Sequence, residues 1–247
     1  MLEQEEQDGI AIWRLNHGKV SALDLELCQK LGDTFSSVND SNFRAIVLTG
    51  TGRTFCAGVD LFRVVNGGSE YIRLFLPALN RALEQIFTCP IPVVVAVNGH
   101  AIAGGCILAC AGDVRIAASG NGKIGIPELK VGVPFPAIAL EIMRSAVPEF
   151  LSKLLTEGST YGMNEARTLG LVDKVVEPVA LLEEALAQAR RLASVPKASF
   201  RLTKELLRAP AIQNLRNAAS IDQEVMSVWS DPEILDAIRG YLDKTLA

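Results

Sequence analysis

The sequence predicts a mixed α/β fold that continues into a helical C-terminal region. Runs of β-branched residues such as Val93–Val97 predict buried strands. Glycine-rich turns follow these runs and amphipathic patterns follow the turns, as expected where strands alternate with helices. Beyond Val195 and Pro196 only helical patterns remain. We therefore expect a core over residues 1–195 and a helical region over residues 196–247.

The first half of the chain alternates between the two kinds of element. Hydrophobic spacing predicts strands at 10–15, 44–49, 93–97 and 114–117, and helices at 23–38, 70–88 and 106–111. Ser21 or Asp24 is the expected N-cap of the first helix. The segment 54–61 shows neither the alternation typical of a strand nor the spacing typical of a helix. A loop of small residues directly after a buried strand is a place where proteins often present binding backbone.

The second half is mostly helical. The predicted helices cover 137–146, 148–156, 164–169, 179–193, 196–208, 212–229 and 232–245. Before them, Glu128 follows Pro127 as a lone carboxylate in an apolar stretch. No internal repeat of solenoid length interrupts this pattern.

Composition argues against several functions. The 247 residues are 49% hydrophobic and 21% charged, which is ordinary for a globular protein. A net charge of −4 argues against nucleic acid or an anionic membrane as the main partner. The acidic N-terminus lacks the apolar segment of a secretory signal, so a cytoplasmic protein is expected. Five cysteines and only two histidines predict buried free thiols and no metal site.

The stretch from Pro92 to Ala117 combines a buried strand, glycine turns and the start of a helix. Such a strand-to-helix turn leaves free backbone N–H groups at the first helical turn. Gly104 and Gly105 lack a Cβ, so a ligand could approach this backbone closely. Tight packing of the helix on the strand is the other interpretation of the two glycines.

Small-residue backbone follows a buried strand in a second place, at Cys56–Ala57–Gly58. If the fold brings this segment to Gly104, two N–H donors could converge on one carbonyl oxygen and form an oxyanion hole. Glu128 would then be the acid/base group, because apolar surroundings raise the pKa of a carboxyl. Alternatively, Glu128 only stabilises the first turn of a helix.

Other chemistries lack their residues. The sequence has no G-x-S-x-G nucleophile elbow, no Walker A motif and no G-x-G-x-x-G dinucleotide fingerprint. His100 is interpreted as a turn or packing residue and His17 as a surface residue, and neither has a visible partner for nucleophilic catalysis.

Four segments together resemble the enoyl-CoA hydratase/isomerase (crotonase) superfamily. They are 54–61 (TFCAGVDL), 98–106 (NGHAIAGGC), 124–128 (IGIPE) and 169–176 (LGLVDKVV). Each motif alone is weak, but the ordered set is specific and spans nearly the whole chain. The resemblance implies a spiral of ββα units and a C-terminal region that forms trimers, often stacked as hexamers. It also implies an acyl-CoA thioester as the substrate, without a metal or separate cofactor.

The resemblance assigns roles to individual positions. Ala57 and Gly104 would supply the two N–H groups that hold the thioester oxygen. Val59, Asp60 and Leu61 fall where family members line the adenine pocket. The full set of expected substrate-binding positions is Lys19, Val20, Ala57, Gly58, Val59, Asp60, Leu61, Gly104, Ile107, Phe135, Tyr241 and Lys244.

Three of these groups of positions carry more specific expectations. Lys19 and Val20 fall in a segment that flanks the CoA. Tyr241 and Lys244 match a pair that reaches CoA from the tail of a neighbouring subunit, where a basic residue suits a phosphate. Phe135, with Val133 and Ile107, is expected to line an acyl pocket.

One position departs from the family pattern. Family hydratases place a glutamate three residues after the oxyanion glycine, and this chain has Ile107 there. Water addition is easiest with two carboxylates, whereas a single carboxylate can move a proton between C2 and C4. The apolar side chain of an isoleucine also excludes water from the site, which disfavours water as a nucleophile. We therefore expect a Δ3–Δ2-enoyl-CoA isomerase with Glu128 as proton shuttle. A hydratase with another acid and a silent acyl-CoA-binding protein are the alternatives.

Overall fold

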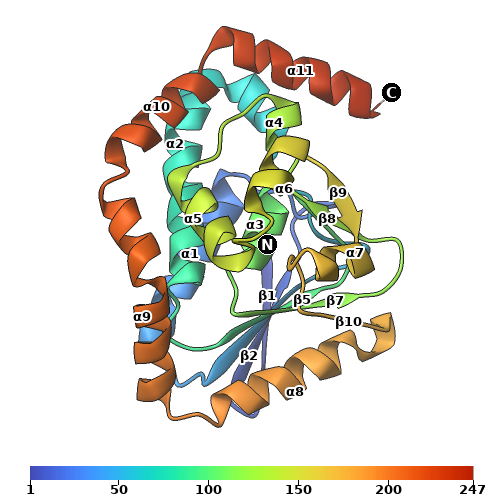
Figure 1. The fold of residues 1–247 in the computed structure, drawn as a ribbon, viewed down its shortest axis with the longest axis vertical. Coiled ribbons are helices and arrows are strands. Elements are labelled where there is room, and N and C mark those ends of the chain that lie inside the picture. Colours follow the sequence, from blue (N-terminus) through green and yellow to red (C-terminus); the bar gives the residue numbers. More distant parts are fainter. Residues whose placement is uncertain (247) are drawn as a thin grey trace.

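The larger of two β-sheets crosses the lower half of the molecule in Figure 1. The structure, a computed structural model, describes residues 1–246. In spatial order the six strands are β1 (Leu2–Gln7), β2 (Ile10–Leu15), β3 (Ala45–Gly50), β5 (Val93–Val97), β7 (Val114–Ala118) and β10 (Lys174–Val176). All neighbours pair in parallel except β1, which runs antiparallel to β2.

A smaller sheet holds the short strands that follow the long ones. Its order is β4 (Thr54–Cys56), β6 (His100–Ile102), β8 (Lys123–Gly125) and β9 (Thr160–Gly162). A strand of the large sheet, a strand of the small sheet and a helix recur three times along the chain. The first two of these units end in α2 (Leu61–Phe87) and α3 (Gly104–Cys110), and the third in α4 (Glu128–Val131). This repeat confirms the predicted spiral of ββα units.

The remaining helices cover the sheets. They are α1 (Leu25–Ser36), α5 (Ala137–Ala146), α6 (Leu151–Glu157), α7 (Met163–Thr168), α8 (Leu181–Ala193), α9 (Lys197–Arg216), α10 (Ala219–Trp229) and α11 (Pro232–Leu246), with short 3₁₀ turns at Ser37–Asp40 and Pro178–Ala180. Helix α8 packs against β3, β5 and β7 on one face of the large sheet, as Figure 1 shows. The main core lies on the other face. Every residue of β5 is consequently buried.

The C-terminal helices form a separate layer. In Figure 1 α9 and α10 climb one side of the molecule, and α11 crosses the top. Helix α11 packs against α2 and α4 of the same chain. The predicted boundary after Val195 falls between α8 and α9. No helix in the described part of the chain has the length and apolarity needed to cross a membrane.

Three sequence-based element predictions are wrong. The segment 54–61 was expected to be irregular, but Thr54–Cys56 forms a strand because it pairs with β6. Helix α2 begins at Leu61, capped by the Asp60 side chain, and kinks at Gly68, where φ is 54°. The helix predicted from residue 70 is therefore only its second part.

Separate helices were predicted at 196–208 and 212–229, yet α9 continues through Pro210 to Arg216 and α10 begins only at Ala219. Arg208 and Ala211 are buried on either side of the proline, and this packing keeps the helix together. Strand β1 was not predicted, because its side chains are mostly polar and exposed and its strand pairing is with β2.

Candidate active site

A cavity of about 90 Å³ lies where α2, α3, α4 and the C-terminal helices meet. Its walls are mostly apolar. The lining includes Ala57, Val59, Leu61, Leu79, Leu83, Gly104, Ile107, Glu128, Val133, Pro134, Phe135, Ala139, Trp229 and Tyr241. The cavity thus collects residues from positions 57 to 241, which the spiral and the C-terminal layer bring together.

Glu128 is the acidic group of this cavity. It is the first residue of α4 and is only 7% exposed. Neither of its carboxylate oxygens has a hydrogen-bond partner among the described residues. Burial raises the pKa of Glu128 from 4.5 to about 8, since the charged form loses its hydration. A carboxyl with a pKa near neutrality can both take up and release a proton at physiological pH.

Ile107 faces the cavity from the first turns of α3 and is 3% exposed. Within the described chain, Glu128 is the only carboxylate among the lining residues, and the hydroxyl of Tyr241 is the only other side-chain group there that ionises. The position where a second acid was missing from the sequence is therefore part of the cavity wall, and it is apolar.

The backbone N–H groups near Glu128 differ in availability. The N–H of Ala57 donates to the carbonyl oxygen of Val20 at 3.1 Å, so this donor is already used. Among the residues that the structure describes, the N–H groups of Val59 and Gly104 have no acceptor. Val59 forms an isolated parallel bridge with Leu23, in which the residues flanking Val59 make the hydrogen bonds and its own N–H points away.

Val59 and Gly104 are neighbours. A Cβ built on Gly104 would lie 3.7 Å from Cγ2 of Val59. Gly58 has a φ of 88°, and a Cβ there would come within 2.6 Å of the carbonyl oxygen of Ile102. A Cβ on Gly105 would come within 2.1 Å of the carbonyl oxygen of Cys56. The glycines therefore serve close packing of the two segments, and this packing brings two free N–H groups together.

A backbone strap fixes the loop that contains Val59. Besides the bond from Ala57 to Val20, Leu23 donates to the carbonyl oxygen of Gly58 at 2.7 Å, and Asp60 donates to that of Leu23 at 2.9 Å. The segment 20–23 thus runs beside 57–60 and sets the direction of each peptide group. We call residues 17–24 the strap.

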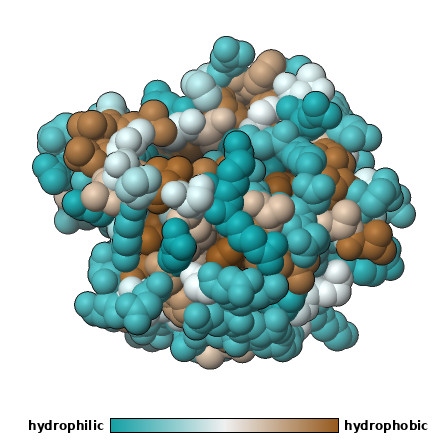
Figure 2. Space-filling model, turned by 90° about the horizontal axis from the view of Figure 1, so that it is seen from below, coloured by the Kyte–Doolittle hydropathy of each residue, from teal (hydrophilic) through white to brown (hydrophobic). Residues whose placement is uncertain are grey.

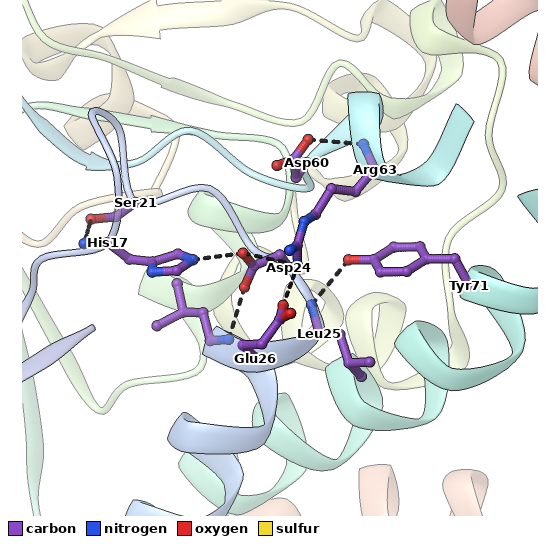
Figure 3. Close-up of polar contacts among 9 residues, drawn as sticks. His17, Ser21, Asp24, Leu25, Glu26, Asp60, Arg63 and Tyr71 are labelled. Carbon is purple, nitrogen blue, oxygen red and sulfur yellow. Dashed lines mark hydrogen bonds and ion pairs between the residues drawn. The ribbon is translucent and has the colours of Figure 1, made fainter. Parts of the chain in front are cut away.

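Polar side chains fasten the strap at Asp24, as Figure 3 shows. One carboxylate oxygen, Oδ1, caps α1 by accepting from the N–H of Leu27 at 2.8 Å. The other, Oδ2, lies 2.6 Å from Nε2 of His17 and 3.3 Å from Nη1 of Arg63. Arg63 also pairs with Glu26. His17 is thus a partly exposed residue that pairs with a carboxylate and with no nucleophile.

The predicted site residues divide into three groups. Those that line the cavity are Ala57, Val59, Leu61, Gly104, Ile107, Glu128, Phe135 and Tyr241. Gly58 and Asp60 lie in the same loop, but outside the lining. Lys19 and Val20 are exposed on the strap, and Lys244 is exposed on α11. All five predicted free thiols are buried and unpaired. His100 begins strand β6 and is therefore not a turn residue, and its Nδ1 accepts a hydrogen bond from the N–H of Lys123.

Tyr241 lines the cavity of its own chain, because α11 folds back onto α2 and α4. That Tyr241 and Lys244 reach the CoA of a neighbouring subunit stays a prediction. Trp229 of α10 lines the same cavity and was missed. A lone tryptophan in an amphipathic helix gives no sequence signal that separates a cavity wall from ordinary packing. The free N–H of Val59 was also missed, because the direction of the peptide groups in residues 57–60 is set by hydrogen bonds to the strap, which is distant in sequence.

Comparison with known proteins identifies the family. The enoyl-CoA hydratase/isomerase family model matches residues 5–245, and the chain belongs to this family. A putative enoyl-CoA hydratase of Thermus thermophilus is 34% identical over 89% of this chain and 87% of its own length. A crotonyl-CoA hydratase of Syntrophomonas wolfei is 31% identical over 100% of this chain and 96% of its own.

A solved structure supports the same assignment. The crystal structure of human mitochondrial delta3-delta2-enoyl-CoA isomerase superposes with a TM-score of 0.94 at 25% identity, covering 99% of this chain and 97% of that one. The predicted crotonase-like fold is confirmed, and membership of the family implies an acyl-CoA substrate.

Proposed function

We propose that this protein is an enoyl-CoA isomerase that moves the double bond of a 3-enoyl-CoA to the 2-position. The observation that carries this proposal is the cavity with one carboxylate. Glu128 is buried there without a hydrogen-bond partner, and Ile107 occupies the wall where a second acid would be needed. Double-bond migration requires one proton carrier and no water, which suits a dry cavity with a single acid.

The proton transfer balances without any added reactant. The carboxylate of Glu128 removes a proton from C2 of the substrate, and the electron pair forms a C1–C2 double bond as the thioester oxygen becomes negative. Glu128, now neutral, returns the same proton to C4. The double bond then lies between C2 and C3, and the thioester carbonyl is restored. One group acts as base and then as acid, so a pKa near neutrality favours both steps.

The oxyanion is held by backbone. We assign the N–H groups of Val59 and Gly104 to the thioester oxygen, because both are free and lie side by side. This assignment replaces Ala57, whose N–H is bonded to Val20. Each such donor contributes about 3–4 kcal/mol to transition-state stabilisation in acyl-transfer enzymes.

The CoA part of the substrate would lie outside the cavity, along the strap. Lys19 and Val20 are exposed there, and Asp60 and Gly58 lie in the loop that the strap holds. The ammonium group of Lys19 suits a CoA phosphate, as does that of Lys244 on α11. These five residues keep their predicted roles in CoA binding.

Hydration is the competing activity, and the names of the curated relatives favour it. A direct comparison separates the two. Purified protein is assayed for conversion of 3-hexenoyl-CoA to 2-hexenoyl-CoA and for water addition to crotonyl-CoA. We expect the first reaction to be at least 100-fold faster. The opposite ratio would make the protein a hydratase, and tight CoA-ester binding without either reaction would make it a silent binding protein.

The role of Glu128 is tested by Glu128→Gln with Glu141→Gln as the matched control. Glu141 is equally buried, on α5, and does not line the cavity. Loss of a general acid/base lowers kcat by about 100- to 10,000-fold, and we expect this loss only in Glu128→Gln. Equal rates in both variants would remove Glu128 from the mechanism.

A homotrimer, or a hexamer of two stacked trimers, is the proposed assembly. The support comes from the C-terminal layer, where Leu202, Leu206 and Leu207 expose apolar side chains on α9. The face seen from below carries separate hydrophobic patches between hydrophilic residues (Figure 2). Light scattering coupled to size-exclusion chromatography should give three or six times the 26.5 kDa mass of the chain. A monomer mass would refute this assembly.

A further inference from the structure

Trp229 forms part of the cavity wall contributed by the C-terminal helices. It is the last residue of α10 and is 3% exposed. The groups assigned to chemistry come from other elements: the 57–60 loop, α3 and α4. Helix α10 instead packs against α2 and α11. Trp229 therefore contributes a wall of the cavity from an element that carries none of the groups assigned to chemistry.

The indole of Trp229 is fixed. Its Nε1 donates to the carbonyl oxygen of Pro134 at 2.9 Å, which satisfies the polar edge of a buried ring. A second bond joins the same two segments, since the N–H of Ala137 donates to Oδ1 of Asp222 at 3.2 Å. Helix α10 is thus held to the segment that leads into α5 at two points, and the wall that it forms resists displacement by a ligand.

Four further wall residues are apolar and suit a hydrocarbon group. Leu79 and Leu83 come from α2, Phe135 from the segment before α5, and Ala139 from α5 itself. None of these side chains offers a hydrogen bond. An acyl chain in this cavity would therefore pack against hydrocarbon side chains and the indole ring, with the Tyr241 hydroxyl and Glu128 as the polar groups of the lining. Its length, and no polar feature, would decide whether it fits.

The volume of the cavity indicates which length fits. A dry cavity of about 150 Å³ lined by aliphatic and aromatic side chains binds benzene, which has six carbons. The present cavity of about 90 Å³ is smaller. By this comparison it holds fewer than six carbons, so it would accept an acyl chain of about four carbons with the thioester end toward the opening.

We propose that Trp229 closes the acyl end of the cavity and restricts the protein to short-chain acyl-CoA esters. This inference rests on the proposed function in one respect, namely that the acyl thioester occupies this cavity with its oxygen at Val59 and Gly104. It does not depend on which reaction follows.

Binding of saturated acyl-CoA esters tests the inference separately from catalysis, because these esters have no double bond to move or to hydrate. Dissociation constants are measured by calorimetry for butyryl-, hexanoyl-, octanoyl- and decanoyl-CoA. For the native protein we expect decanoyl-CoA to bind at least about tenfold more weakly than butyryl-CoA, since even one misplaced methylene costs about tenfold or more. Equal affinity for all four esters would refute the short-chain restriction.

Substitutions identify the residue responsible. In Trp229→Ala, decanoyl-CoA should bind at least about tenfold more tightly than in the native protein, while butyryl-CoA changes by less than about threefold. Trp229→Phe keeps a ring and should keep the native order of affinities. Val225→Ala shortens another buried residue of α10 that does not line the cavity, so it should also keep that order.

Two outcomes would overturn the role of Trp229. One is an unchanged order of affinities in folded Trp229→Ala, and the other is the same shift in Val225→Ala, which would point to general loosening of α10. Thermal unfolding checks that each variant is folded. Where the alanine variant does not fold, Trp229→Leu, which keeps an apolar side chain, is measured against the same four esters with the same expected direction. Failure of isomerase activity in the native protein would leave these binding results intact.

Discussion

Ile107 and Glu128 line one cavity from two adjacent turns of the spiral, and only one of them can carry a proton. Ile107 is on α3, three residues after Gly104 with its free N–H, and Glu128 begins α4. Both are buried, at 3% and 7% exposure. The arrangement gives the cavity one acid in an apolar wall. Most of the proposed chemistry follows from this pair.

Introducing the missing acid should change the reaction. In Ile107→Glu a second carboxylate would face Glu128 and could position a water molecule, so water addition to crotonyl-CoA should rise at least about tenfold. Thermal stability should fall, because two carboxyl groups are then buried together. Ile107→Gln, with similar size and no acid, should show the destabilisation without the gain in hydration. Equal hydration rates in the two variants would contradict the idea.

The pH dependence of isomerisation should report the ionisation of Glu128. Burial raises its pKa to about 8, and only the ionised carboxylate can remove a proton from C2. Below pH 8 the value of kcat/KM should therefore fall about tenfold per pH unit, and above pH 8 it should level off. The measurement is kcat/KM between pH 5.5 and 9.5 in buffers of constant ionic strength. A profile that is flat from pH 6 to 9 would exclude this role of Glu128.

The same carboxyl should make the stability of the protein depend on pH. Between pH 4.5 and about 8 the folded protein holds a proton that unfolded Glu128 has released. Folding stability must then fall as the pH rises through this window, by up to about 5 kcal/mol from this group alone. Glu128→Gln removes the ionisation and should be more stable than the native protein at pH 8, but not at pH 4. Urea unfolding at the two pH values measures the difference.

The Glu141→Gln variant serves again as the control in this experiment. Glu141 lies beside Arg144 at 3.4 Å, away from the cavity. Its replacement should not make the protein more stable at pH 8. If both glutamine variants gained equally at pH 8, the effect would arise from net charge and not from the burial of Glu128.

The strap should depend on Asp24. Its side chain caps α1 and contacts both His17 and Arg63. Asp24→Ala should lower the free energy of unfolding by about 2 kcal/mol, because a buried cap and a charged hydrogen bond are lost together. It should also lower kcat, since the strap directs the N–H of Val59. Asp24→Asn keeps an acceptor for the cap and should lose about half as much stability.

Urea unfolding and steady-state kinetics on the same two variants check this prediction. If Asp24→Ala is destabilised but keeps the native kcat, the strap supports the fold and not the oxyanion donor. If Asp24→Asn loses as much stability as Asp24→Ala, the ion pairs and not the cap dominate.

Long buried strands were predictable, and short ones were not. Strands such as β3 and β5 consist of continuous apolar residues that are buried on both faces, so hydrophobicity alone marks them. The three-residue strands β6 and β8 exist only because the spiral places them next to each other. Strand β1 carries acidic, exposed side chains and is defined by its ladder with β2. The local residue pattern of these strands does not predict such pairing.

The residues proposed to carry chemistry were predictable from the sequence itself. Gly104 is needed where the backbone must stay open, Glu128 is a lone carboxylate in an apolar stretch, and Ile107 stands where an acid would otherwise be. These are properties of side chains, or of their absence, and they can be recognised from residue type and spacing.

Only the tertiary structure decided which backbone N–H groups are free and which C-terminal residues complete the cavity wall. The strap uses the N–H of Ala57 and leaves that of Val59 free, which depends on hydrogen bonds between segments more than 30 residues apart. The return of α11 onto α2 and α4 brings Tyr241 to the cavity of its own chain, and α10 brings Trp229. Burial by these distant segments also raises the pKa of Glu128. Each of these properties belongs to a packed arrangement of residues, and no single stretch of sequence contains it.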